Sequence, residues 1–453
     1  MKIASLLPFL ILGIFSIFAG FIPQIGVETG GGPINPGDVA WMLTATALVL
    51  LMTPGLSFFY GGMVRRKNVI STMLQSFIAM GIITLLWVGF VFSLAFGESI
   101  GGVIGNPLTF IMMHNVGGLT HPDLSPTIPL ALFALFQLKF AIITPALITG
   151  SFAERVRFSS YMLFITLFSI FIYAPLAHWT WHPSGFLRQW GVLDFAGGSV
   201  VHMSAGFAAL AGALVLGRRN DHSEHDNGPA HLPFVLLGTG MLWFGWFGFN
   251  AGSALAASEL AAQAFLTTNT ASAAAMLAWI FFDMARGRKP SSLGACIGAV
   301  VGLVAITPAA GFVSVGASVF IGTAASLISN LAVHWKSRST LDDTLDVFPC
   351  HGVGGIVGMI LTAVFAKDVG LLSGESATFV HHIYALGIVS VFTFFGSYLL
   401  YKLTDLIIPL RVNAAQELQG LDLSQHGETL ARPIPAAAED DGSQCATLKA
   451  ANY

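Results

Sequence analysis

Long apolar segments recur along almost the whole chain, and they restrict the fold more than any other feature of the sequence. Each has about 20 or more mostly apolar residues, the length that a helix needs to cross the hydrocarbon core of a bilayer. Only 9% of the 453 residues are charged, whereas a soluble domain carries about 25%. We therefore expect an all-α polytopic membrane protein. Eleven spanning helices are predicted, at roughly 40–62, 70–96, 128–150, 159–177, 195–216, 232–256, 267–285, 291–311, 314–333, 348–366 and 380–406.

Charge and cysteine content exclude several classes of partner. The formal net charge of -3 is close to neutral, so no nucleic-acid partner is expected. The three cysteines Cys296, Cys350 and Cys445 are far apart and odd in number. They support neither a disulfide framework nor a metal cluster, and no metal or cofactor is predicted.

The first 22 residues combine one lysine with an apolar run, as a secretory signal peptide does. The residues before Ala19 and Gly20 are bulky where a cleavage site prefers small ones, so an uncleaved first helix remains the alternative. In both cases residues 23–38, which are polar and rich in Gly and Pro, are expected outside, and residues 39–406 form the membrane domain.

The basic residues indicate which loops face the cytoplasm, where Lys and Arg accumulate. Twelve of the 20 basic residues fall in five alternate loops: Arg65, Arg66, Lys67, Arg155, Arg157, Arg218, Arg219, Arg286, Arg288, Lys289, Lys336 and Arg338. The other set of loops holds only Arg188 and Lys367. This predicts a mature amino end outside, a cytoplasmic tail over 407–453 and a location in the plasma or inner membrane.

Two acid–histidine pairs lie at the start of predicted spans. Asp194 precedes His202 by eight residues, and Asp343 precedes His351 by eight. Eight residues of helix rise about 12 Å, so each acid is expected near one membrane face and each His near the bilayer centre. The fifth span runs inward and the tenth outward. We therefore predict a 5+5 inverted repeat plus one further helix, with a transport site at its midplane.

Small residues flank both histidines, so the fifth and tenth spans can cross closely and the two imidazoles can meet. One ring would then donate a hydrogen bond to the other. Two alternatives remain for the pair. Each His could be a core residue bonded to a backbone carbonyl, or the two could ligate a haem iron axially, although no further ligand cluster or attachment motif is present.

Several long blocks of the sequence resemble the signatures of the ammonium transporter family, Amt/Mep/Rh, over residues 40–426. The blocks are FYGGMVRRKNV (59–69), FQLKFAIITPALITGSFAERVRF (136–158), DFAGGSVVHMSAGFAALAGALVLGRR (194–219), WFGWFGFNAGSA (243–254), KPSSLGACIGAVVGLVAITPAAGFVSVGAS (289–318) and DVFPCHGVGGIVG (346–358). The resemblance implies an eleven-helix protomer in a homotrimer, with one pore in each protomer.

The resemblance also implies roles for individual residues. Phe140 and Phe249 match the stacked rings that close the outer vestibule, and Trp181 and Ser253 match the recruitment site that Phe140 completes. His202 and His351 match the twin-His pair of the narrow pore, and Asp194 matches the essential acid beneath the recruitment site. Gln137 and Trp246 match positions around the gate and pore. Trp181 favours the Amt/Mep branch, since the Rh branch generally lacks it.

These roles have a physical basis. An aromatic face attracts a cation by roughly 0.5–2 kcal/mol, and a Ser hydroxyl accepts a hydrogen bond from N–H, which potassium cannot donate. Asp194 could cap a helix start, stabilise an ammonium ion, or do both. The expected mechanism is deprotonation near Asp194, passage of ammonia through the pore, and proton transfer along the His pair, with net movement of charge.

The segment 411–428 also resembles the family's cytoplasmic tail, in which the positions of Gly420, Asp422 and His426 belong to a part that docks on neighbouring subunits. In bacteria this face meets PII-type signalling proteins. The alternative is a simple surface helix. Residues after about 430 are Ala-rich and polar and are predicted to be disordered.

Three other functions are possible alternatives to transport for a chain with these features. An ammonium sensor or receptor would bind at Trp181 and Ser253 and signal through the tail. A neutral gas channel of the Rh type would be indicated by loss of Trp181. An enzyme is not expected, because no set of nucleophile, base and orienting residue stands out. Lys139, beside Phe140 within a span, has no partner that the sequence identifies.

Overall fold

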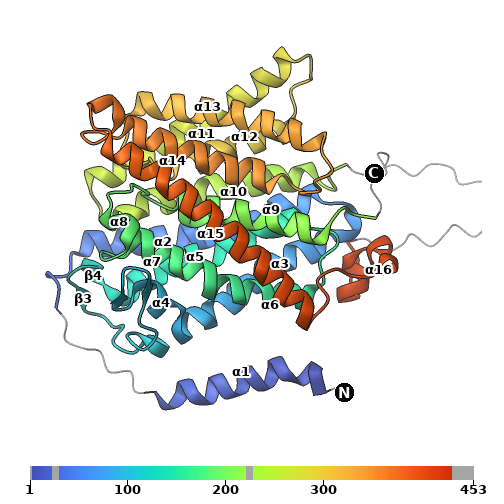
Figure 1. Ribbon diagram of the computed structural model, residues 1–453, viewed down its shortest axis with the longest axis horizontal. Helices are drawn as coiled ribbons and strands as arrows, with labels where there is room; N and C mark the ends of the chain where they lie inside the picture. Colours follow the sequence, from blue (N-terminus) through green and yellow to red (C-terminus); the bar gives the residue numbers. More distant parts are fainter. Residues whose placement is uncertain (1–2, 23–29, 221–227, 431–453) are drawn as a thin grey trace, which may run out of the picture.

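The computed structural model describes residues 3–22, 30–220 and 228–430, and this part of the chain is almost entirely helical (Figure 1). Ten of its helical segments are long and apolar enough to cross a membrane. Five of them are single helices: Pro36–Met63 (α2), Leu130–Phe152 (α5), Glu259–Ala285 (α11), Val315–Ser337 (α13) and Ala377–Ile407 (α15). The other five contain shorter named elements. They are Arg66–Phe96 (with α3, Val69–Leu86, and α4, Phe92–Phe96), Phe158–Gln189 (with α6, Phe158–Phe168, α7, Ala174–Trp181, and α8, Phe186–Gln189), Gly198–Leu216 (with η5, Gly198–Met203, and α9, Ser204–Leu216), Leu232–Ala254 (with α10, Leu232–Ala251) and Phe348–Phe365 (with η7, Phe348–Val353, and α14, Gly354–Phe365). The polytopic all-α class is confirmed.

The predicted count of eleven full spans is not confirmed, because the segment at 291–311 forms a shorter helix. This helix, α12 (Ser292–Ile306), has 15 residues, or about 22 Å at 1.5 Å per residue. Its last residue is Ile306, Thr307 caps it, and Pro308 follows. The apolar residues after Ile306 turn back into the bundle, where the carbonyl of Pro308 accepts a hydrogen bond from Phe195 N at 3.1 Å.

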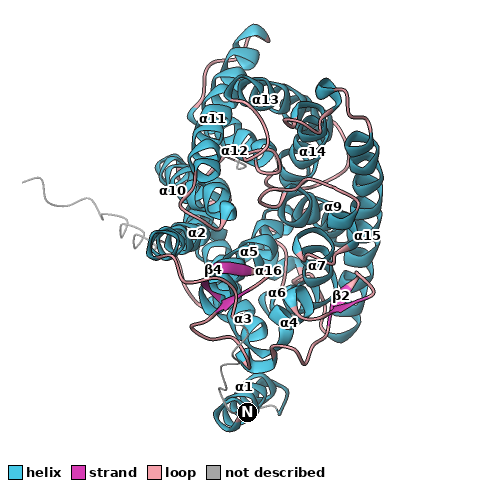
Figure 2. Cartoon of the chain, turned by 90° about the vertical axis from the view of Figure 1, so that its left-hand side faces the viewer, coloured by secondary structure: helices cyan, strands magenta, loops and turns pink. Residues whose placement is uncertain are grey.

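Two short hairpins precede α5. Strand β1 (Ser99–Ile100) pairs antiparallel with β2 (Ile104–Gly105), and β3 (Thr120–His121) pairs antiparallel with β4 (Ser125–Pro129). Figure 2 looks along the bundle and shows both hairpins at its near end. We call this the Asp194 end and the opposite end, which carries α16 in Figure 1, the Asp343 end.

Glycines, of which the chain has 50, allow the helices to approach closely. A Cβ added to Gly238 of α10 would clash with the backbone of Phe59 and Gly55 in α2. Where the two His-bearing segments cross, a Cβ on Gly206 would clash with the backbone of Gly352. The predicted close crossing of the fifth and tenth spans is therefore present.

Helix α1 (Ile3–Phe21) lies beside the bundle, and most of its apolar side chains that the structure describes are exposed (Figure 1). Its Phe15 ring approaches Gly89 of the second span. A signal peptide over residues 1–22, with an uncleaved helix as the alternative, stays a prediction. The predicted disorder after residue 430 concerns residues outside the described part.

The tail folds back onto the Asp343 end of its own chain. It forms α16 (Ala414–Gln419) and η9 (Asp422–His426). Gly420 adopts φ +97° and packs on Lys67, a conformation that residues with a Cβ rarely adopt. The Asp422 carboxylate accepts hydrogen bonds from Ile70 N at 3.1 Å and Ser71 N at 2.7 Å. His426 Nε2 lies 3.1 Å from the Ser71 hydroxyl. This segment is therefore docked and is not a free surface helix.

A buried ion network joins the loops at the Asp343 end. The Glu154 carboxylate, 1% exposed, lies 2.7 Å from both Arg65 Nη2 and Arg219 Nη1. Arg219 Nε also donates to Asp342 at 2.9 Å. Burial by itself would raise the pKa of Glu154, but the charges of Arg219 and Arg65 hold it below its ordinary value. The pKa of Asp342 is likewise held far below its usual range, against burial, by Arg155 and Arg219.

Glu154→Gln is expected to destabilise the protein by about 3–5 kcal/mol, because it leaves buried guanidinium groups without their counter-charge. A carboxylate with a lowered folded-state pKa stabilises the fold above its ordinary pKa of about 4.3, and this stability is lost as pH falls below it. Thermal unfolding in detergent between pH 7 and 3 should therefore show that wild type loses stability more steeply than Glu154→Gln as the pH falls. The exposed Glu375→Gln is the control. Identical pH profiles for wild type and Glu154→Gln would contradict the role of this network.

Candidate functional site

The Asp194 carboxylate caps the start of η5. It accepts hydrogen bonds from Gly197 N at 2.8 Å, Gly198 N at 2.6 Å and Ser199 N at 2.7 Å, and from the Ser199 hydroxyl. Gly197 adopts φ +116° at the turn into the helix. Four donors fix the carboxylate at the positive end of the helix dipole, where an anion is stabilised. The capping role considered for Asp194 is thus present.

Asp343 repeats this arrangement at the opposite end of the bundle. Its carboxylate accepts from Val347 N at 3.1 Å and Phe348 N at 2.7 Å, at the start of η7. Both caps begin short π-helical segments, and each π-helix carries one of the two histidines. The predicted mirrored pair of acid and histidine is present in the fold.

The two histidines meet in the interior. His202 Nδ1 and His351 Nδ1 are 3.3 Å apart, and both side chains are buried. At this distance one Nδ1 carries a proton and donates a hydrogen bond, which the other Nδ1 accepts. In a neutral pair the ring that donates through Nδ1 has a bare Nε2, and the ring that accepts carries its proton on Nε2. His202 Nε2 has no hydrogen-bond partner among the described residues.

An aromatic stack covers the His pair on the side of the Asp194 end. The Phe140 and Phe249 rings are stacked with centroids 4.1 Å apart. Below them the Trp246 ring stacks on His202 at 5.3 Å, and the Trp246 indole N–H donates to the Thr307 hydroxyl at 2.9 Å. The Phe249 ring centroid is also 6.0 Å from that of His202, so the stack lies directly against the His pair.

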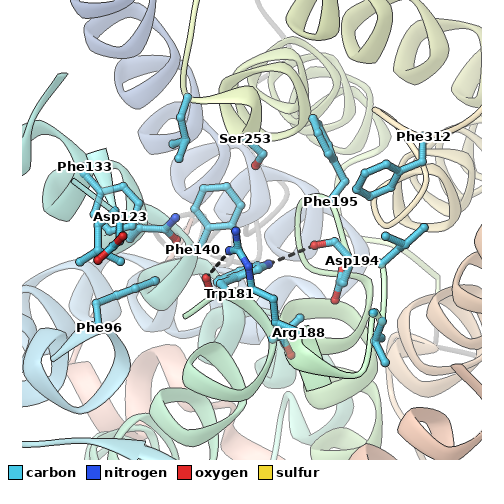
Figure 3. Close-up of a pocket in the computed structure, with 17 residues that line it drawn as sticks. Phe96, Asp123, Phe133, Phe140, Trp181, Arg188, Asp194, Phe195, Ser253 and Phe312 are labelled. Carbon is cyan, nitrogen blue, oxygen red and sulfur yellow. Dashed lines mark hydrogen bonds between the residues drawn. The ribbon is translucent and has the colours of Figure 1, made fainter. Parts of the chain in front are cut away.

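A cavity of about 370 Å³ opens above this stack at the Asp194 end (Figure 3). Its lining includes the predicted residues Phe140, Trp181, Asp194, Ser253 and Gln137. The Trp181 ring meets Phe140 edge-on at 5.7 Å, and its indole N–H donates to the Asp194 carbonyl at 3.2 Å. Aromatic rings, the hydroxyl-bearing residue Ser253, two acidic residues and Arg188 therefore line one space.

A second, much smaller cavity lies on the other side of the His pair. It has about 10 Å³, the size of a single water, and His351, Cys350 and Tyr60 are among its lining. The Tyr60 hydroxyl donates to the Leu147 carbonyl at 2.9 Å. The larger cavity, the aromatic stack, the His pair and the smaller cavity thus follow one another through the bundle.

Some of these residues were not identified from the sequence. Thr307 positions Trp246 from a turn 61 residues away. Arg188 lines the larger cavity and Tyr60 lines the smaller one. Pro308, a residue type that disfavours a helix interior, is a local signal that could have indicated the turn at Thr307. Lys139 is buried, and no described residue is seen to pair with its amine. No group of three or more His, Cys, Asp or Glu residues in the described part is placed to hold a metal ion.

Comparisons with known proteins show which family the chain is similar to. The family model described as Ammonium Transporter Family matches residues 40–431. The ammonium transporter of Aquifex aeolicus is 45% identical over 426 residues, which cover 92% of this chain and 97% of the relative. The crystal structure of Saccharomyces cerevisiae Mep2 matches with a TM-score of 0.80 and 34% identity, over 84% of this chain and 89% of Mep2. A structure described as a sensor Amt protein matches with a TM-score of 0.80 and 28% identity, over 86% of this chain and 98% of its own. The chain therefore belongs to the ammonium transporter family.

Proposed function

We propose that this protein takes up ammonium by binding it in the large cavity, removing its proton and passing ammonia between the two histidines, with the proton crossing separately. The observation that carries the proposal is the 3.3 Å contact of His202 and His351 directly below a stacked aromatic pair. A buried, mostly apolar passage admits a neutral molecule far more readily than a bare cation.

Recruitment takes place between Trp181, Phe140 and Ser253. The ring faces attract a cation, and the Ser253 hydroxyl has acceptor capacity left, since it donates to the Phe249 carbonyl at 2.8 Å. Ammonium donates four N–H bonds and potassium donates none, so the hydroxyl favours ammonium. Asp194 supplies the negative charge at the floor of this site.

Ammonia then passes the stacked rings and reaches the histidines. The tautomers set by the Nδ1 contact leave one Nε2 as acceptor and the other as donor. Ammonia can donate to the first and accept from the second. The same pair can relay a proton if both rings exchange their tautomers. Because the proton crosses together with neutral ammonia, net transport is electrogenic.

In this proposal the Asp194 end faces outward and the tail lies in the cytoplasm, as the distribution of Lys and Arg predicts. The protein resides in the plasma or inner membrane as a homotrimer. The docked tail, with Gly420, Asp422 and His426, offers a cytoplasmic face to a PII-type signalling protein. The relatives are named as transporters, so an enzymatic role is not proposed.

A second candidate function is ammonium sensing. It is favoured by the likeness to the structure described as a sensor Amt protein. A sensor would bind ammonium in the same cavity, and its tail would report occupancy without net flux.

Trp181→Leu tests the recruitment site in proteoliposomes pulsed with ammonium. We expect the ammonium concentration at half-maximal current to rise about fivefold to 30-fold, while the maximal current stays within about twofold, because a cation–π contact of about 1–2 kcal/mol is lost. Trp181→Phe should recover most of the affinity.

Trp190→Leu is the matched control, because Trp190 is an exposed indole at the same end that does not line the cavity. Equal half-maximal concentrations in Trp181→Leu and wild type would refute recruitment at Trp181. Ammonium binding by wild type without any flux would favour the sensor.

A further inference from the structure

A positive side chain enters the cavity that the proposal assigns to a cation. Arg188 belongs to the short helix α8 and lines the cavity wall. Its Nη1 donates to the carbonyl of Trp181 at 2.6 Å. In Figure 3 the side chain extends over Trp181 toward the ring of Phe140. The guanidinium therefore shares the mouth of the cavity with the recruitment residues.

The hydrogen bond to Trp181 uses one of the five guanidinium N–H donors. It is the single hydrogen bond that the Arg188 side chain makes within the part of the chain that the structure describes. The side chain is exposed to solvent at the mouth. Arginine stays protonated at any physiological pH, so its charge is a permanent feature of the entrance.

An opposite charge lies on the other wall. Asp123 stands in the turn between β3 and β4 and lines the same cavity. Its backbone N–H donates to His121 Nδ1 at 3.2 Å, which fixes the turn. No ion pair joins Asp123 to Arg188 in the described structure, and Figure 3 shows the two on different sides of the cavity. Their charges act on the entrance separately.

A positive charge at the mouth repels an entering cation, and a negative one attracts it. Two unit charges several ångströms apart near a protein surface interact by enough to change an affinity several-fold, and salt screens this interaction when both are exposed. The wall charges of Arg188 and Asp123 oppose each other, so the acid beneath them, Asp194, gives the cavity its net negative charge.

We propose that Arg188 is an affinity-determining residue of the entrance: its charge, opposed by Asp123, lowers occupancy of the recruitment site by any monovalent cation, while its hydrogen bond holds Trp181 in place. This rests on the proposed function, because it concerns the same site. The arrangement keeps the outer site from filling with the commoner cations, and hydrogen bonding at Ser253 then selects ammonium among those that enter.

Arg188→Gln tests this, because glutamine keeps an N–H donor for the Trp181 carbonyl and removes the charge. Ammonium chloride is titrated into the full-length protein in detergent, with tryptophan fluorescence as the readout, at ionic strengths of about 10 mM and about 500 mM. We expect the Kd of Arg188→Gln to be about threefold to tenfold lower than that of wild type at low salt and nearly equal at high salt.

Three further variants separate charge from structure. Asp123→Asn should raise the low-salt Kd by a similar factor, and the double variant Arg188→Gln with Asp123→Asn should return to near the wild-type value. Arg188→Lys, which keeps the charge, should keep the wild-type salt dependence. Arg338→Gln makes the same charge change at the far end of the bundle and should leave the Kd unchanged.

The half-maximal concentration of the ammonium current in proteoliposomes should follow the same order. An Arg188→Gln protein whose low-salt Kd equals or exceeds that of a wild type that binds ammonium would overturn this inference and leave the proposed function intact. A wild type that neither binds nor carries ammonium would overturn both.

Discussion

Asp194→Ala is expected to reduce the ammonium current at least about 100-fold, which corresponds to about 2.7 kcal/mol at 1.36 kcal/mol per tenfold. The carboxylate supplies the negative charge beneath the recruitment site, and without it a desolvated ammonium ion has no counter-charge. Current measured on a solid-supported membrane after an ammonium pulse gives this ratio. Binding by Asp194→Ala should weaken in the same preparation.

Asp343→Ala is the matched control for the capping role. Asp343 also caps a π-helix, with two backbone donors, but it does not line the large cavity. Both variants lose a helix cap, which costs about 0.5–2 kcal/mol of stability. If capping alone explained Asp194, the two variants would lose current in proportion to their thermal stabilities. A folded Asp194→Ala protein with wild-type current would contradict the electrostatic role.

Replacing both His202 and His351 with alanine is expected to abolish discrimination against potassium. The two imidazoles fill the passage and offer one donor and one acceptor to ammonia, and their loss leaves room for water and hydrated cations. Potassium pulses should then evoke currents within about tenfold of the ammonium currents, whereas wild type should show none above background. An internal-pH dye should also report that proton transfer has become independent of ammonium.

Cys350→Ala is the control for local repacking, because Cys350 lines the small cavity beside His351 and bears no hydrogen-bonding role in the pair. It should retain selectivity. A double His variant that still excludes potassium while conducting ammonium would show that selectivity is set elsewhere, at the aromatic stack or the recruitment site.

Much of the architecture followed from hydropathy, because a segment in lipid must satisfy its own backbone and so becomes a helix. Helix α11 nevertheless begins at Glu259, eight residues before the expected 267, where Ser258 caps it by accepting from Ala261 N. The prediction of a full span at 291–311 is not confirmed, for a related reason. Residues after Ile306 are as apolar as a helix requires, but they turn inward because the surrounding helices bury them, and hydropathy does not distinguish lipid from protein interior.

The site was predictable in part. The equal spacing of Asp194 to His202 and Asp343 to His351 gave the mirrored pair, and the resemblance supplied Phe140, Phe249, Trp181 and Ser253. The contact of Trp246 with Thr307 and the entry of Arg188 into the cavity depend on how distant segments pack. No local pattern encodes such contacts. Arg188 in particular was an ordinary charge of an outer loop until the fold placed it over Trp181.

The most direct test of the central claim is simultaneous recording of charge movement and internal pH in proteoliposomes given an inward ammonium gradient. The account predicts a saturable inward positive current that accompanies nitrogen entry and is absent with potassium. Because ammonia and a proton enter together, the interior should show little alkalinisation. Nitrogen entry with strong internal alkalinisation and no current would mean that ammonia crosses alone, and it would contradict the account.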